Sequence, residues 1–207
     1  MKNLSNRNLI KKAVKHLSSA DGILAEIIEK HGPCTINPAF DNPLHALVSS
    51  IVSQQLSARV ARAIKGRLFE LIGEETFTPN KIISKLSARN IRSAGLSRAK
   101  YKCIHELALA ANRRRIDFGT IANSDDEDVI EKLTAFSGIG RWTAEMFLIL
   151  GLGRPDVLST KDAGLRRGFK ILYNLQETPS EAEMISISEP WRPYRSVESW
   201  YLWRVVD

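Results

Sequence analysis

Apolar residues recur at helical spacing through most of this 207-residue chain. Asp41-Asn42-Pro43 is a helix-start signal, and an apolar stripe at i, i+3, i+4, i+7 and i+8 follows it at Leu44, Leu47, Val48, Ile51 and Val52. Alternation of the kind found in strands never extends beyond a few residues, and the chain has no repeat and no low-complexity linker. The sequence therefore predicts an all-α protein.

Capping residues and glycines divide the rest of the chain into further helices. Ser124 and Glu127 have the spacing of a capping box, which predicts a helix start ahead of Gly138-Ile139-Gly140. A second helix is expected after this turn. The other expected helices cover 57–73, 79–86, 97–113, about 163–173, and the residues from about 194 onward.

The charge of the chain limits its partners. It has 30 Lys and Arg against 23 Asp and Glu, a net charge of +7 that favours a polyanion as partner. Cys34 and Cys103 are isolated thiols, which cannot supply a four-cysteine cluster and suggest a reducing compartment. Charges interrupt the N-terminus, and no apolar run approaches the roughly 20 residues of a membrane span. We expect a cytosolic or nuclear protein without a membrane partner.

The turn Gly138-Ile139-Gly140 joins two expected helices. Glycine there permits positive φ and close approach of another backbone. The N–H groups from Gly138 to Trp142 begin the second helix, and such a cluster is suited to bind an anion such as a DNA phosphate. A plain turn between packed helices is the alternative.

Four segments together resemble one protein family. LTAFSGIGRWTAEMF followed by PDVLSTKDAGLRR is similar to the helix-hairpin-helix DNA glycosylases that have a Gly/Pro-rich loop and a catalytic aspartate. More narrowly, the chain resembles the 3-methyladenine DNA glycosylase II branch. The resemblance runs from about Asp41 to the C-terminus and also includes SSIVSQQLSARVA (Ser49–Ala61), GLSRAK (Gly95–Lys100) and WRPYRSVESWYLWR (Trp191–Arg204).

The resemblance implies a fold and an activity. The fold is a two-lobed, all-α arrangement with the active-site cleft between the lobes, N-terminal helices over 1–40 and a core over 41–207 whose hairpin spans about 128–150. The activity is hydrolysis of the N-glycosidic bond of alkylated purines (3-methyladenine, 7-methylguanine) in duplex DNA, by base flipping, as the first step of base excision repair. The family implies a monomer with no required cofactor and no metal, and leaves a monovalent cation at the hairpin open. It would act in the cytoplasm or nucleoid of a bacterium or archaeon, or in a eukaryotic nucleus.

The family's catalytic aspartate corresponds to Asp162. Cleavage of an N-glycosidic bond builds positive charge on the sugar, and a fixed carboxylate stabilises that charge and helps to activate water. Asp162 is also placed to cap the helix that begins at Ala163, and both roles can hold together. Asp156 is the nearest rival, but it lies in a connection that the family motif aligns as structural.

The family position of the strand-cleaving lysine is occupied by Trp142. Glycosylases that also cut the strand use a lysine amine to form a Schiff base. Lys161 neighbours Asp162 but does not match that position. The sequence therefore favours a monofunctional hydrolase.

The resemblance assigns a base pocket to Trp142, Trp203 and Met146. Indole faces can stack on a flipped base and favour a cationic one. Both tryptophans could instead be ordinary core residues. Met146 and Ala163 stand where some bacterial members have aromatic rings, which puts the substrate range in doubt.

Leu56 matches the family's wedge, which fills the gap left by the flipped nucleotide, although a buried core leucine is the alternative. Gln54 and Gln55 would reach the unpaired base or the minor groove. The remaining expected DNA contacts are Gly138, Ile139, Gly140, Arg141, Thr143, Lys161, Arg166 and Arg167, although any one cation among them could be merely solvated. A non-catalytic helix-hairpin-helix DNA-binding protein, with Asp162 as a cap only, remains the alternative function.

Overall fold

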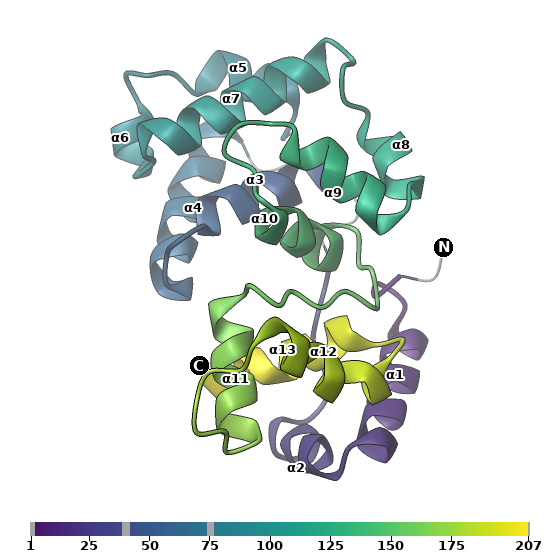
Figure 1. The fold of residues 1–207 in the computed structure, drawn as a ribbon. Coiled ribbons are helices and arrows are strands. Elements are labelled where there is room, and N and C mark those ends of the chain that lie inside the picture. Colours follow the sequence, from purple (N-terminus) through teal and green to yellow (C-terminus); the bar gives the residue numbers. More distant parts are fainter. Residues whose placement is uncertain (1–2, 39–41, 74–76, 207) are drawn as a thin grey trace. The chain divides into compact units, whose positions relative to one another are not determined.

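Helices make up the structure of this chain (Figure 1), a computed structural model that describes residues 3–38, 42–73 and 77–206. No strand occurs within these ranges, so the all-α prediction is confirmed. The α-helices are α1 (Arg7–Ala20), α2 (Gly22–His31), α3 (Pro43–Ser53), α4 (Ala58–Ile72), α5 (Pro79–Lys85), α6 (Ile91–Ala94), α7 (Arg98–Asn112), α8 (Phe118–Asn123), α9 (Asp126–Thr134), α10 (Arg141–Met146), α11 (Ala163–Leu172), α12 (Glu181–Ser188) and α13 (Arg195–Val206). A π-helical turn, η2 (Phe147–Gly151), and a 3₁₀ turn, η3 (Glu189–Trp191), complete them.

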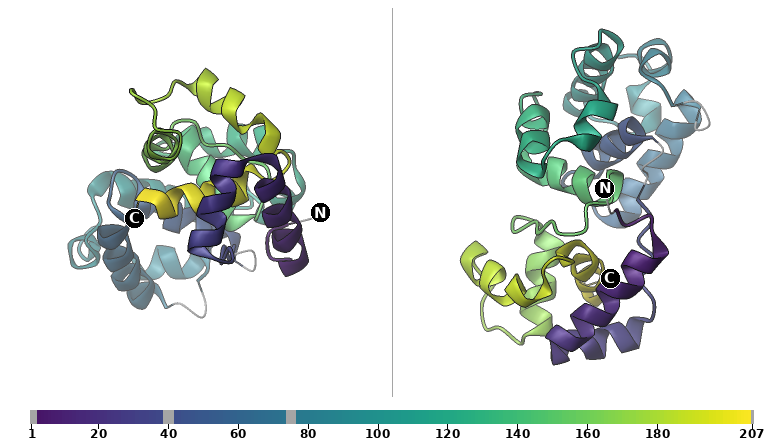
Figure 2. Two further views of the ribbon diagram at one scale, coloured as in Figure 1. Left: turned by 90° about the horizontal axis from the view of Figure 1, so that it is seen from below. Right: turned by 90° about the vertical axis from the view of Figure 1, so that its right-hand side faces the viewer.

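The chain divides into two compact units by its contacts. The first unit comprises Met1–Pro38 and Leu148–Asp207, and the second comprises Ala39–Phe147. Helices α1 and α2 lie beside α13 within the first unit (Figure 2). The predicted boundary at residue 40 lies outside the described residues, and the division into 1–40 and 41–207 stays a prediction.

The first unit is held together by the close packing of α11 against α13. A Cβ added to Gly168 in α11 would lie 2.9 Å from the carbonyl oxygen of Leu202 in α13, so only glycine fits there without a shift. Leu165 and Phe169 of α11 are fully buried. The two helices therefore pack closely at Gly168 and Leu202, and this contact fixes their register.

Asp21 links the N-terminal helices to the rest of the first unit. Its Oδ1 caps α2 by accepting hydrogen bonds from the N–H groups of Ile23 and Leu24. Its Oδ2 accepts hydrogen bonds from the Tyr173 hydroxyl and from Nε1 of Trp191, at 2.5 and 3.1 Å. One carboxylate thus connects α2, the end of α11 and η3.

The second unit contains α3 to α10, and α3 lies at its centre. Val48, Ile51 and Val52 of α3 are all 0% exposed. Asn42 caps this helix through the N–H of His45, while Asp41 of the predicted start signal lies outside the described residues. Helix α5 lies alongside α7, as Figure 1 shows.

The capping box predicted at Ser124 and Glu127 is wrong. The residue before α9 is Asp125, while Ser124 ends α8 and donates its hydroxyl to the carbonyl of Thr120. The Glu127 carboxylate accepts hydrogen bonds from the guanidinium of Arg141 instead, and this ion pair across the hairpin replaces the cap. A capping box does form at the start of α12, between Ser180 and Glu183.

Candidate functional site

Asp162 is a buried carboxylate at the first turn of α11. The residue is only 8% exposed. Oδ1 accepts a hydrogen bond from the N–H of Leu165 at 2.7 Å and a second from Nε1 of Trp203 at 3.0 Å. The predicted capping role is confirmed, and the indole is a second donor that fixes the carboxylate.

Gly164 leaves room for this arrangement. A Cβ added there would lie 3.1 Å from Oδ1 of Asp162 and 3.1 Å from Cδ1 of Trp203. The close packing of Gly168 against Leu202 holds the neighbouring Trp203 in place. The local sequence of α11 therefore sets the position of the carboxylate through small residues as well as through hydrogen bonds.

Asp156 has a different environment. Its Oδ1 accepts from Nε of Arg195 at 2.6 Å, and its Oδ2 accepts from Nη2 of Arg195 and Nη1 of Arg192, at 3.0 and 2.9 Å. Two guanidinium groups thus neutralise this carboxylate and tie the 154–157 connection to the start of α13. The geometry gives Asp156 a structural role.

The two glycines of the hairpin turn between α9 and α10 serve different purposes. Gly138 has φ of +88°, and a Cβ there would lie 3.2 Å from Cβ of Cys103. Gly140 has φ of −93°, and a Cβ there would meet no atom within 4 Å. The fold requires glycine at 138, whereas at 140 it leaves open space in front of the backbone.

The expected anion-binding amides are fewer than the sequence predicted. The N–H of Ile139 donates to the carbonyl of Phe136 at 3.1 Å, and the Ile139 side chain is buried. The expectation that this amide has nothing to bond is therefore wrong, since the turn itself uses that donor, while the contact of Ile139 with DNA stays a prediction. The N–H groups of Gly140 and Arg141 donate to no described residue, and they remain available to an anion.

Gln54 joins the turn after α3 to the hairpin. Its Nε2 donates to the carbonyl of Gly138 and to Oγ1 of Thr143, both at 2.8 Å. The Thr143 side chain is buried, and its hydroxyl serves this contact. The side-chain amide N–H groups of Gln54 thus connect two parts of the protein that the sequence assigned to DNA.

Lys100 holds the same turn from the other side, a role that the sequence did not reveal. Its Nζ donates to the carbonyls of Val52 and Gln54, both at 2.8 Å. Burial lowers the pKa of this ammonium from its ordinary value. The lysine ends the GLSRAK segment, and that segment was the only signal that could have pointed to it.

Gln55 and Leu56 lie on the turn that Lys100 and Gln54 hold. Gln55 has φ of +54°, an uncommon conformation for a residue other than glycine. Leu56 is 36% exposed at the junction between α3 and α4. The alternative that Leu56 is a buried core leucine is wrong, and a protruding apolar side chain fits the wedge.

The predicted phosphate-binding cations are differently occupied. The Arg141 guanidinium donates to both oxygens of Glu127 and to Oε1 of Glu145, so carboxylates already neutralise it. Nη2 of Arg166 donates to the carbonyl of Pro179. Lys161 and Arg167 are exposed.

The expected pocket residues divide between the two units. Trp142 and Met146 lie one turn apart on α10 in the second unit, and Met146 is 4% exposed. Trp203 belongs to the first unit with Asp162. Among the described residues there is no cluster of three or more His, Cys, Asp or Glu side chains that could hold a metal. No helix in the described part of the chain is both long and apolar enough to cross a membrane.

Comparison with known proteins agrees with this geometry. A sequence model of the HhH-GPD superfamily of base excision DNA repair proteins matches residues 48–193. The chain belongs to this superfamily. The predicted resemblance is thereby confirmed, including its alkylpurine glycosylase branch.

Individual relatives span nearly the whole chain. The alkylbase DNA glycosidase-like protein mag2 of Schizosaccharomyces pombe is 31% identical over 94% of this chain and 93% of its own length. The solved structure of the S. pombe 3-methyladenine DNA glycosylase Mag1 in complex with abasic DNA has a TM-score of 0.86 and 31% identity, covering 93% of this chain and 95% of that one. A Bacillus halodurans DNA-3-methyladenine glycosidase has a TM-score of 0.75 and 41% identity, covering 93% and 88%.

Proposed function

We propose that this protein is a monofunctional DNA glycosylase that removes alkylated purines, 3-methyladenine and 7-methylguanine, from duplex DNA and so initiates base excision repair. The observation that supports this most directly is the geometry of Asp162. Its buried carboxylate is fixed by the Leu165 N–H and the Trp203 indole N–H, at the position of the family's catalytic aspartate. The alkylbase and 3-methyladenine specificities in the names of its relatives support the substrate class.

The proposed chemistry follows from the charge that develops during the reaction. As the glycosidic bond breaks, the deoxyribose acquires oxocarbenium character, and a preorganised carboxylate stabilises that charge without reorganising. The two donors on Oδ1 keep Asp162 oriented. An alkylated purine with a formal positive charge departs as a neutral base, so the enzyme needs to supply only part of the barrier reduction.

The remaining assignments in the proposal concern the DNA. Leu56 would enter the stack in place of the flipped nucleotide, and the amides of Gly140 and Arg141 would contact a phosphate. Trp142, Trp203 and Met146 would contact the base. We propose that the protein acts as a monomer and needs no cofactor. A monovalent cation at the hairpin also stays a proposal. The carbonyls of Gly138 and Gly140 already accept hydrogen bonds from the protein.

The test is release of free base from a methylated duplex, measured by chromatography, for the wild type and Asp162→Asn. Asparagine keeps an Oδ1 that can accept from Leu165 and Trp203, so helix α11 keeps its cap while the negative charge is lost. We expect no measurable base release from the variant and unchanged affinity for lesion DNA. Excision by Asp162→Asn at the wild-type rate would refute the catalytic role.

One specific observation favours the alternative of a non-catalytic DNA-binding protein, because Asp162 does cap α11. The same assay separates the two functions, since a pure binding protein releases no base in either form. Strand cleavage is tested with borohydride. Trp142 occupies the lyase-lysine position, so we expect an intact strand with an abasic site and no covalent adduct on DNA.

A further inference from the structure

Three arginines converge on the loop before α7 in the second unit. Arg92 lies in α6, Arg98 begins α7, and Arg67 lies in α4. Nη2 of Arg67 would be 2.7 Å from a Cβ placed on Gly95, which puts its guanidinium directly against the loop between the other two. The left-handed conformation of Gly95, with φ of +78°, makes this loop tight.

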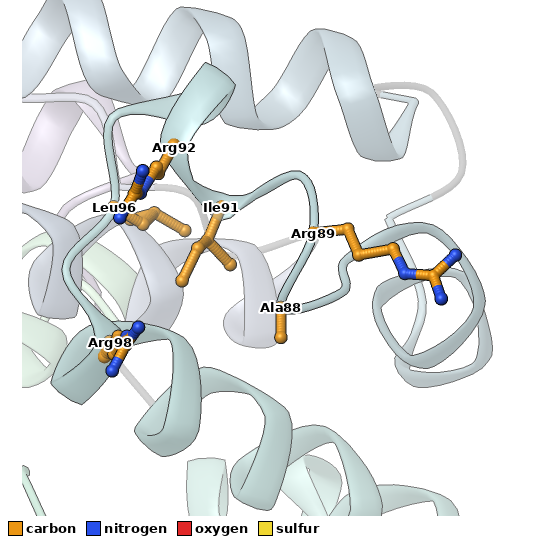
Figure 3. Close-up of a pocket in the computed structure, with 6 residues that line it drawn as sticks. All are labelled: Ala88, Arg89, Ile91, Arg92, Leu96 and Arg98. Atoms are coloured by element: carbon orange, nitrogen blue, oxygen red, sulfur yellow. The ribbon is translucent and has the colours of Figure 1, made fainter.

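Arg92 and Arg98 line an open pocket of about 480 Å³ together with Ala88, Arg89, Ile91 and Leu96. Figure 3 shows the side chains of Arg92 and Arg98 on the side of the loop where Leu96 lies, whereas Arg89 extends away from them. Ile91 and Leu96 are 4% and 6% exposed, so they give the pocket a buried apolar floor. Such a floor supports the stems of the arginines while their charged ends stay in water.

No carboxylate of the described residues neutralises this group. The pocket has no acidic lining residue, and none of Arg67, Arg92 and Arg98 forms an ion pair with a residue in the described ranges. The contrast with Arg141, which two glutamates hold, is clear. Neighbouring guanidinium groups repel one another, and an anion with several oxygens relieves that repulsion while accepting paired hydrogen bonds.

The pocket is connected to the turn that carries Leu56. Arg98 precedes Lys100 by two residues on α7, and Nζ of Lys100 is 2.8 Å from the carbonyl oxygen of Gln54. Leu56 follows Gln54 by two residues. All of these residues belong to the second unit, and Arg98 lies two residues along α7 from the lysine that holds the turn of Leu56.

We propose that Arg92 and Arg98, assisted by Arg67, form a site for a backbone phosphate of the bound DNA, separate from the amides of the hairpin. The inference rests on the proposed function, because it assumes that Leu56 enters the base stack of the bound DNA. The ligand chemistry is that of a phosphate oxyanion. We propose that this phosphate belongs to the nucleic-acid backbone rather than to a free phosphorylated molecule.

The first experiment measures affinity for an undamaged duplex as a function of salt. The variant Arg92→Gln/Arg98→Gln should lower the magnitude of the slope of log K against log salt by about 0.9, since both arginines contact one phosphate and the loss of one phosphate contact removes about that much. The matched control is Arg113→Gln/Arg115→Gln, which removes the same charge at the other end of α7, a helix of 15 residues and about 22 Å. An unchanged slope, or an equal drop in the control, would overturn the site.

The second experiment separates the two sources of phosphate. Inorganic triphosphate is titrated into the wild type and the double variant at constant ionic strength. We expect no saturable binding that depends on Arg92 and Arg98. Saturable binding to the wild type alone, with an unchanged salt slope for DNA, would assign the pocket to a free phosphorylated ligand and refute the proposal.

A third experiment locates the phosphate. Single methylphosphonates, placed along both strands of an abasic duplex, each remove one negative charge. At the contacted position the substitution should weaken the wild type but not Arg98→Gln, and equal losses at every position would contradict the site. The outcome is independent of catalysis. If the wild type releases no base but the salt slope of DNA binding is smaller in the double variant, the site stands and the proposed function is refuted. If the wild type releases base but the salt slope is the same in the double variant, the site alone is refuted.

Discussion

Nε1 of Trp203 donates a hydrogen bond of 3.0 Å to Oδ1 of Asp162, so the indole and the carboxylate form one unit. The family resemblance gives Trp203 a place in the base pocket, where only its ring face matters. The observed contact adds a second role, because the same side chain orients the carboxylate that would face the sugar. The close packing of Gly164 against both side chains shows that this contact is built into α11.

The change Trp203→Phe tests this positioning role. It keeps an aromatic ring but removes the indole N–H donor to Oδ1 of Asp162, while the hydrogen bond from the Leu165 N–H to the same oxygen remains. We expect single-turnover base release to fall about tenfold, which corresponds to about 1.4 kcal/mol of transition-state stabilisation. Affinity for lesion DNA should stay within about twofold, because the stacking surface remains.

The control is Trp200→Phe, since Trp200 also lies on α13 but its ring packs on Tyr201 and Arg204. This variant should release base at close to the wild-type rate. A loss in affinity without a change in rate for Trp203→Phe would show that the indole acts on the base alone.

Alanine substitutions at the two hairpin glycines should affect different properties, stability at Gly138 and DNA affinity at Gly140. Gly138→Ala places a Cβ against Cys103 in a left-handed conformation, so we expect a loss of stability of about 1–3 kcal/mol. Gly140→Ala meets no neighbouring atom, and the fold should be unaffected. Its methyl group would instead stand in front of the free amides and weaken binding of undamaged and lesion duplexes alike. Thermal unfolding and binding at matched salt measure both effects, and full affinity in Gly140→Ala would rule out a phosphate at this turn.

Lys100→Met should loosen the turn that carries Leu56. The substitution leaves the carbonyls of Val52 and Gln54 without their charged donor, and we expect about 1–3 kcal/mol less stability and slower excision. Lys102→Met removes the same charge from an exposed position on α7 and should change stability by less than about 0.5 kcal/mol. Denaturant unfolding and single-turnover excision measure the two variants. Equal behaviour of the pair would mean that the contacts of Lys100 are dispensable.

Local sequence signals were sufficient for most of the fold. Helix starts depend on neighbouring residues, so the helix start at Ser57 and the cap at Asp162 were identifiable from the sequence, and the structure confirms both. Asp125 rather than Ser124 precedes α9, and the Glu127 carboxylate pairs with Arg141, 14 residues away, instead of returning to the helix start. A capping pattern, which spans only four residues, fails where a residue far along the chain binds the same side chain.

The site was less predictable because its contacts join distant segments. Gln54 reaches Gly138 across 84 residues and Lys100 reaches Gln54 across 46, and no periodicity encodes either pair. A motif can show that Gln54 belongs to a functional turn. A motif cannot show that the side-chain amide nitrogen of Gln54 donates to another segment of the protein, as it does in the structure.

Glu198 is a buried acid that no sequence pattern indicated. It lies on α13 with 0% exposure, and its Oε1 has no hydrogen-bond partner among the described residues. Burial raises the pKa of its carboxyl well above the ordinary value, the Ser199 hydroxyl and the charge of Arg195 lower it, and the charge of Asp21 raises it. Folding therefore favours the protonated form of Glu198 relative to the unfolded chain.

The sign of the resulting pH dependence follows from proton binding. Above the unfolded pKa of about 4.3, the folded state binds more protons than the unfolded state, so this group makes stability fall as pH rises until the folded pKa is passed. Glu198→Gln keeps a neutral side chain of similar shape at every pH. Relative to the wild type, its free energy of unfolding should rise as pH increases from about 4.3, and denaturant titrations at pH 5 and pH 8 measure the difference. The control Glu29→Gln, at an exposed position of α2, should show no such trend, and a constant difference between Glu198→Gln and the wild type would mean that Glu198 is ionised in the folded protein throughout this range.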